Sequence, residues 1–176
     1  MMTKSRTEQI LIVMHILAWV VCIGLMIEAG AILVSFGVSC VNPEAAKNLY
    51  QGLDLYALRR FSFWYYAQAA SFMFALAGMK AYVVFLVIRT LAEVKLLNPF
   101  KVEVALMLEK ISYVLLGIWL VALVSSAHAD WLLKTTGEVY PIGASGEFLF
   151  AAGLVFIISQ IFKRGVELQS ENELTV

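Results

Sequence analysis

The feature that most constrains this chain is a set of four long apolar segments separated by polar ones. The segments are Ile10–Val38, Phe61–Ile88, Ile111–Ala129 and Phe148–Phe162. A helix needs about 20 mostly apolar residues to cross a bilayer. The first two segments exceed that length, the third just meets it, and the fourth reaches it only if it begins near Ile142. The sequence therefore predicts four transmembrane helices.

The composition agrees, because 61% of the residues are hydrophobic and only 15% are charged. A soluble domain has roughly 45–50% apolar and about 25% charged residues. We predict an all-α fold, a four-helix transmembrane bundle that forms a single membrane domain over residues 1–176. The expected helices are 10–38, 61–88, 99–129 and 144–163, with a polar elbow at 89–110 and a polar tail at 163–176. The net charge of zero indicates no basic surface for direct binding of nucleic acid.

The first apolar segment is predicted to be a retained helix. It is about twice as long as the apolar region of a secretory signal peptide. The two cysteines, Cys22 and Cys40, lie 18 residues apart on this helix, which separates them by about 27 Å along its axis. They are therefore not expected to bond to each other.

The distribution of Lys and Arg predicts the orientation, because cytoplasmic loops carry an excess of these residues. With the N-terminus inside, eight cations lie in inner segments: Lys4, Arg6, Arg89, Lys95, Lys101, Lys110, Lys163 and Arg164. Four lie in outer loops: Lys47, Arg59, Arg60 and Lys134. This asymmetry predicts that both termini are cytoplasmic. Arg59 and Arg60 are the exception, since they adjoin the second helix on the outer side.

Local signals place structure in the first outer loop and at the second helix. Asn42-Pro43-Glu44 is typical of a helix start, so a short helix is expected over Pro43–Leu49. An aromatic cluster follows and predicts the outer membrane boundary; its members are Phe61, Phe63, Trp64, Tyr65 and Tyr66. The second helix is rich in Ala, Gly and Ser, which favours close packing at the centre of a bundle.

The elbow holds a second helix-start signal. Asn98 can cap a helix and Pro99 suits its first position, so the third helix is expected to begin there. Beyond Pro99 the pattern is amphipathic, with Val102, Leu106 and Ile111 interpreted as one apolar face. We expect this stretch to lie at the inner interface.

Ionisable residues inside a bilayer cost about 2.5–3.5 kcal/mol on insertion scales and are functional candidates by default. Here they are Glu28, Lys80 and His128. Glu28 and Lys80 are expected to differ in depth by roughly 14 Å, so a direct salt bridge needs a large shift or tilt. Lys80 is alternatively explained by snorkelling of its charge toward the inner headgroups. Glu28 is expected near His128 or the outer loops.

No motif indicates catalysis, a metal or a cofactor. His128 and Asp130 are two residues apart and do not share a helical face. The chain has only two histidines, and it contains no nucleophile elbow, phosphate loop or paired-carboxylate motif. The prediction is a protein without enzyme activity.

Three stretches carry a resemblance to a known family: Lys80-Ala81-Tyr82, the elbow residues Leu97–Phe100, and the end of the chain from Ile161 to Val176. They resemble domain-of-unknown-function family 2975, small bacterial multi-pass membrane proteins that often have Asp where this chain has Glu173. The resemblance implies four transmembrane helices, a place in the bacterial inner membrane and no established activity. Its members are often encoded beside a small helix-turn-helix regulator, which implies such a partner.

The leading functional hypothesis is a regulatory or sensing membrane protein whose elbow and tail form a cytoplasmic interaction surface. After Gly165, which is expected to end or bend the helix, the acidic tail docks on the basic elbow, meets a partner, or is a solvated and partly frayed end. The candidate residues are Lys95, Asn98, Pro99, Phe100, Lys101, Lys110, Glu167, Glu171, Asn172 and Glu173. The alternatives are a transporter or channel subunit that uses Glu28 and Lys80, and a structural subunit of a membrane complex. A homo-oligomer is compatible with each.

Overall fold

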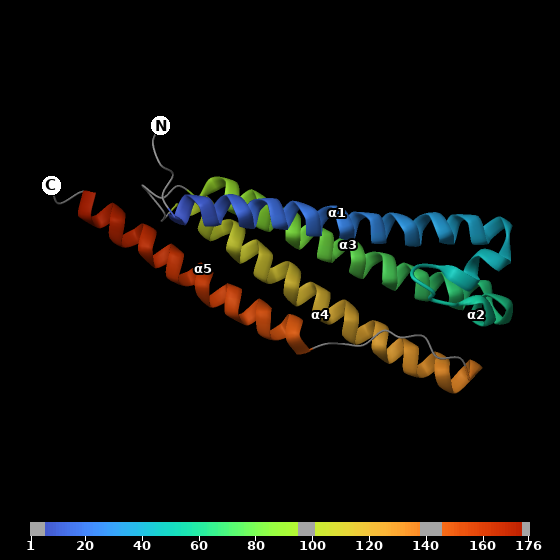
Figure 1. The fold of residues 1–176 in the computed structure, drawn as a ribbon. Coiled ribbons are helices and arrows are strands. Elements are labelled where there is room, and N and C mark those ends of the chain that lie inside the picture. The colour runs from blue at the N-terminus through green and yellow to red at the C-terminus, as the bar shows by residue number, and fades with distance from the viewer. Residues whose placement is uncertain (1–5, 95–100, 138–145, 174–176) are drawn as a thin grey trace. The chain divides into compact units, whose positions relative to one another are not determined.

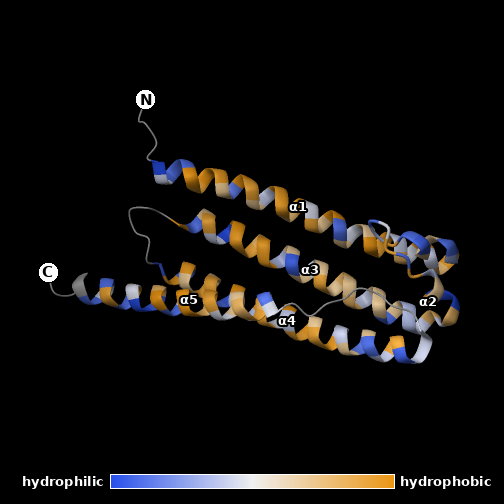
Figure 2. Ribbon diagram, turned by 60° about the horizontal axis from the view of Figure 1, so that its bottom comes forward, coloured by the Kyte–Doolittle hydropathy of each residue, from blue (hydrophilic) through white to orange (hydrophobic). Residues whose placement is uncertain are grey.

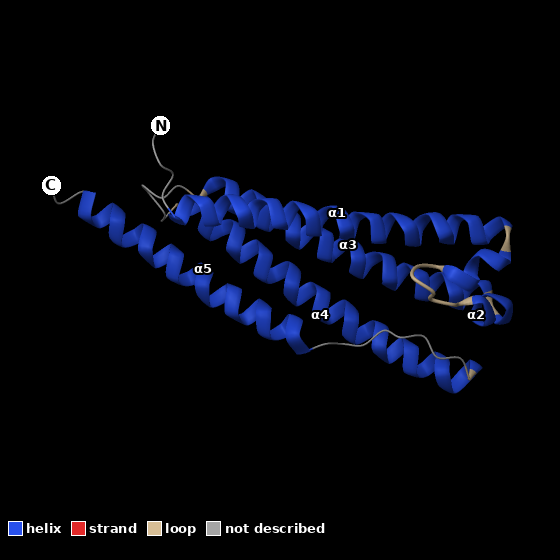
Figure 3. Cartoon of the chain, in the orientation of Figure 1, coloured by secondary structure: helices blue, strands red, loops and turns tan. Residues whose placement is uncertain are grey.

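A computed structural model of the chain describes residues 6–94, 101–137 and 146–173. The regular elements in these ranges are all helical (Figure 3), which confirms the all-α fold. In chain order they are α1 (Arg6–Val41), the 3-10 helix η1 (Pro43–Asn48), α2 (Tyr56–Phe61), α3 (Phe63–Glu93), α4 (Val102–Thr136) and α5 (Gly146–Glu173) (Figure 1).

Four of these helices, α1, α3, α4 and α5, are long and apolar enough to cross a membrane (Figure 2). In α1, only 6% of the most apolar stretch is buried within the protein. Large side chains such as Val20 and Met26 are more than half exposed. Apolar surface on this scale is stable against lipid but not against water. The four helices are therefore those of a multi-pass membrane protein.

The largest difference from the predicted helix bounds is at the end of α5. The expected helix stopped at residue 163, whereas α5 continues through Gly165 to Glu173. An internal glycine costs a helix only about 1 kcal/mol relative to alanine. Glu and Leu residues favour the helix on the far side, and an ion pair between Arg164 and Glu167 spans the glycine. Gly165 therefore does not end the helix.

The end of α4 also lies beyond its expected position at residue 129. The helix continues to Thr136 and stops at Gly137, whose φ of 75° is left-handed. The Gly137 N–H donates to the Leu133 carbonyl oxygen over 2.9 Å, which is how a glycine closes a helix C-terminus. At the other end α4 begins at Val102, and the predicted start signal at Asn98-Pro99 lies outside the described residues.

The chain forms two compact units. The first contains Met1–Cys22, Tyr82–Gly117 and Glu147–Val176, and the second contains Ile23–Ala81 and Ile118–Gly146. Helices α1, α3 and α4 each contribute to both units, while nearly all of α5 belongs to the first.

The first unit is built around the N-terminal half of α4 and the adjoining helices. Its buried residues include Leu86, Ile88, Val104, Ala105, Ile111, Leu115 and Ala152. The predicted apolar face of α4 was wrong in one member: Ile111 is 3% exposed, whereas Val102 and Leu106 are both 51% exposed. Nine residues at about 100° each turn the helix half-way round, so Ile111 lies opposite Val102.

The core of the second unit combines small residues of α3 with the loop that follows α1. Ala69, Ala70 and Ala77 are nearly inaccessible, in agreement with the expectation that the small residues of this helix pack inside. The loop adds four more buried residues, Ala46, Leu49, Leu55 and Leu58. Small side chains let helix backbones approach closely, and the loop covers the end of that contact.

The short helix in this loop begins with the cap that the sequence predicted. The Asn42 side chain accepts the Glu44 N–H over 3.1 Å, with Pro43 in the first position of the short helix. The helix is 3-10 in form and ends at Asn48. The following chain folds back, because the Leu55 N–H donates to the Ala46 carbonyl oxygen over 2.8 Å. A short helix, α2, then precedes α3, so the second long helix begins at Phe63 and not at residue 61.

Candidate functional site

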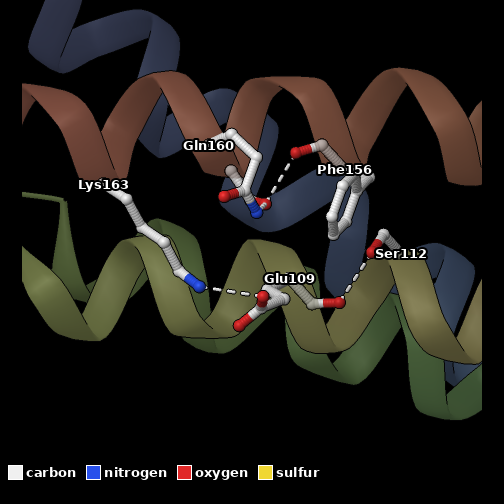
Figure 4. A network of polar contacts seen from close by, with 6 residues as sticks. Glu109, Ser112, Phe156, Gln160 and Lys163 are labelled. Atoms are coloured by element: carbon white, nitrogen blue, oxygen red, sulfur yellow. Dashed lines mark hydrogen bonds and ion pairs between the residues drawn. The ribbon is translucent and has the colours of Figure 1, made fainter.

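An ion pair joins α5 to α4 within the first unit. Lys163 Nζ lies 2.8 Å from Glu109 Oε1 (Figure 4). Further along the same pair of helices, the rings of Tyr113 and Phe156 lie with centroids 6.2 Å apart. Glu109 precedes Tyr113 in α4, whereas Phe156 precedes Lys163 in α5. The two helices are therefore antiparallel at this contact.

Two buried serines lie close to the ion pair in sequence, one on each helix. Ser112 is 3% exposed and donates to the Glu109 carbonyl oxygen, and Ser159 is inaccessible and donates to the Phe156 carbonyl oxygen, both over 2.7 Å. Gln160 Nε2 in turn donates to Ser159 Oγ. Each hydroxyl is satisfied within its own helix. Small polar residues of this kind permit a close approach of α4 and α5.

The charge arrangement at this contact differs from the predicted docking of an acidic tail on a basic elbow. The observed bond has its cation on α5, at Lys163, and its carboxylate on α4, at Glu109. Lys110 lies over the ring of Tyr82, with 5.5 Å from Nζ to the centroid. Glu167 pairs with Arg164 of its own helix over 2.7 Å.

The other predicted interaction residues lie at the edges of the described chain. Lys101 is half-buried just before α4, and its carbonyl oxygen accepts the Ala105 N–H. Glu171 is exposed on α5. Asn172 and Glu173 belong to the last turn of α5, and their side chains are not described. Four elbow residues lie outside the described ranges: Lys95, Asn98, Pro99 and Phe100.

The three predicted intramembrane residues all lie in the second unit. Glu28 on α1 and Lys80 on α3 are both half-buried. Within the described part of the chain, no ion pair joins these two side chains. His128 on α4 has its Nε2 3.0 Å from Gln68 Oε1, and because that oxygen is an acceptor, His128 is the donor. The described neighbours of the His128 ring are Phe72 and Trp131.

A cluster that sequence reasoning did not single out lies at the C-terminal end of α1. Ser39 and Tyr66 are inaccessible, and their hydroxyl oxygens lie 2.8 Å apart. Ser39 donates its single proton to the Phe36 carbonyl oxygen over 2.6 Å, so the Tyr66 hydroxyl donates to Ser39 Oγ. Arg59 Nη2 reaches the Ser39 carbonyl oxygen over 3.4 Å. The Arg59 guanidinium also lies over Phe63, with 4.7 Å from Cζ to the ring centroid.

Comparison with known protein families gives one match. The family described as "Protein of unknown function (DUF2975)" matches residues 41–176, about three quarters of the chain. The chain belongs to the DUF2975 family. No curated protein and no solved structure matches it. The match confirms the resemblance drawn from the elbow and the tail.

The matched part of this DUF2975 protein begins where α1 ends, so it contains the loop, α3, α4 and α5. The Glu109–Lys163 ion pair and Tyr66 lie inside it, whereas Glu28 and Ser39 lie outside it. Two sequence signals pointed toward the missed residues. Arg59 was an exception to the charge asymmetry, and Tyr66 was one of five aromatic residues read as a boundary belt. In that group Trp64 is 74% exposed, as a belt requires, but Tyr66 is a core residue.

Proposed function

We propose that this DUF2975 protein is a non-enzymatic regulatory or sensing component of the bacterial inner membrane. In this proposal it binds a cytoplasmic partner through the ends of α4 and α5 that carry the Glu109–Lys163 ion pair. The observation that carries the proposal is the continuation of α5 as a polar helix from Lys163 to Glu173, beyond its last apolar stretch. Eleven helical residues extend about 16 Å. Binding through a preformed helix loses less conformational entropy than binding through a tail that must first become ordered.

The ion pair gives the extension a defined base. Glu109 keeps only 19% of its side-chain surface exposed and Lys163 keeps 37%. Two charges that are partly withdrawn from water attract each other more strongly than a fully exposed pair. The direction in which the polar helix leaves the membrane is therefore tied to α4.

The surface of the extension supports a partner that is basic and has an apolar groove. Leu168 is 47% exposed, and Glu167 and Glu171 are exposed one turn apart. An exposed leucine between two carboxylates offers a partner one apolar contact and two negative charges. A small helix-turn-helix regulator, the partner that the family resemblance implies, carries the basic surface that such a helix complements. Binding would hold that regulator at the membrane.

The experiment uses the full chain, purified in a non-ionic detergent, and a helix-turn-helix regulator of the kind that is often encoded beside genes of this family. The test variant is Glu167→Gln/Glu171→Gln, and the matched control is Glu44→Gln in the loop after α1. We expect the test variant to weaken binding by at least about tenfold, since the loss of close charge pairs at an interface lowers affinity by a factor of this order. The control variant should bind as the parent chain does. Equal affinity of all three proteins, or no binding by the parent chain, contradicts the proposal.

A further inference from the structure

A groove runs between α1 and α3 in the second unit. Its volume is about 150 Å³, and its walls include Ile32, Leu33 and Phe36 of α1 and Ala67, Ala70 and Phe74 of α3. Ser71 also lines it, but the serine hydroxyl donates to the Gln68 carbonyl oxygen of its own helix. The two alanines leave this space because they are too small to fill it. The groove is therefore apolar, and it lies between two helices that are able to cross a membrane.

Aromatic rings connect one end of the groove to a positive charge. Phe36 lines the groove and stacks on Phe63, with ring centroids 6.3 Å apart. Phe63 lies one turn before Ala67 on the same face of α3. The guanidinium of Arg59 covers the Phe63 ring at 4.7 Å. An apolar groove thus ends beneath a cation.

The guanidinium of Arg59 has unused hydrogen-bonding capacity. Among the residues that the structure describes, no carboxylate forms an ion pair with it. Its Nη2 makes a long bond of 3.4 Å to the Ser39 carbonyl oxygen, and its buried Nε has no acceptor in the described chain. Arginine presents its N–H groups in a planar fork that matches the oxygens of phosphate. A phosphate anion carries the oxygen acceptors that this guanidinium lacks in the described chain.

We propose that this groove binds an anionic phospholipid, with its phosphate on Arg59 and one acyl chain along Phe36 and Ala70. A lipid supplies both the apolar chain and the anion in one molecule. A zwitterionic lipid fits less well, because its ammonium group would meet Arg59, to which no carboxylate of the described chain is paired.

The headgroup is tested with the full chain in a non-ionic detergent, by native mass spectrometry during titration with phosphatidylglycerol or phosphatidylcholine. The parent chain should retain phosphatidylglycerol in preference. Arg59→Gln should lower that affinity by about tenfold, the usual scale for one charge-assisted contact. Arg60→Gln is the matched control, because Arg60 lies over Tyr56, 6.0 Å from its ring, and not at the groove; it should bind as the parent does. Equal retention of the two lipids by the parent chain overturns the proposal without any variant.

The acyl chain is tested at Ser71, which is exposed and lines the groove. Ser71→Leu should fill part of the groove and weaken phosphatidylglycerol binding, whereas Ser71→Ala should leave it unchanged. An excess of inorganic phosphate should not displace the lipid. If phosphate alone displaces it and Ser71→Leu has no effect, the site recognises an anion and not a lipid, which overturns the proposal.

Discussion

Lys163 of α5 and Glu109 of α4 are 54 residues apart in the chain, and their charged atoms lie 2.8 Å apart. Glu109 is the more enclosed partner, with 19% of its side chain exposed against 37% for Lys163. The other two ion pairs of the described chain are different in kind. Both join residues three apart on one helix, and their side chains are about half exposed or more. The Lys163–Glu109 pair is thus the one in this group that connects two helices.

Replacing Lys163 with Met should therefore destabilise the protein. The substitution keeps the length of the side chain but leaves the Glu109 carboxylate partly enclosed without its cation. Breaking a fully buried pair costs about 3–5 kcal/mol, and the partial exposure here reduces the expected loss to about 1–2 kcal/mol. Thermal unfolding followed by circular dichroism in detergent measures the change. Adding Glu109→Gln to this variant should recover part of the loss, because it removes the unpaired charge.

Lys47→Met is the control for that experiment. Lys47 pairs with Glu44 over 2.9 Å, but the two side chains are 49% and 63% exposed. The pair raises the pKa of Lys47 through the hydrogen bond from its ammonium group to Glu44. Exposed pairs of this kind contribute little to stability, because water and salt screen both charges. An equal loss of stability in the Lys47 and Lys163 variants would show that the helix-to-helix pair has no special role.

Tyr66→Phe tests the buried hydroxyl pair at the end of α1. The variant keeps the ring and removes the donor to Ser39, so the free energy of unfolding should fall by about 1 kcal/mol. Tyr65→Phe is the matched control, since Tyr65 is only half-buried and packs its ring edge-on against Trp131. Ser39→Ala combined with Tyr66→Phe should cost less than the sum of the single changes. Strict additivity of the two changes would refute the hydrogen bond.

The parts of the fold that were predictable from the sequence are those controlled by local chemistry. Four apolar runs predict four membrane-spanning helices, and Asn42 before Pro43 predicts the cap that the structure contains. The continuation of α5 was not predictable from hydropathy, because hydropathy does not distinguish a polar helix from a polar coil. Its helix-forming residues, Glu167 and Leu168 among them, were the available signal.

The contacts of the candidate sites were less predictable, because they depend on how distant helices align. Glu109 and Lys163 meet only in the observed antiparallel register of α4 and α5, and nothing near either residue specifies the other. Tyr66 lies in an aromatic cluster of the kind that forms an interfacial belt. Only its buried contact with Ser39 distinguishes it from the members of such a belt. The face of Ile111, in contrast, follows from counting helix turns, so that error was avoidable from the sequence.

Two glycine-to-alanine substitutions should change stability in opposite directions. Gly137 ends α4 with φ at 75°, a conformation that costs an alanine roughly 1–2 kcal/mol. Gly137→Ala should therefore lower the melting temperature. Gly153 lies inside α5, and an added Cβ there meets no atom within 4 Å. Gly153→Ala should raise stability by up to about 1 kcal/mol, because alanine is the better helix former. Both are measured by thermal unfolding in the same detergent, and a loss of stability at Gly153 equal to that at Gly137 would mean that helix propensity does not decide the outcome in α5.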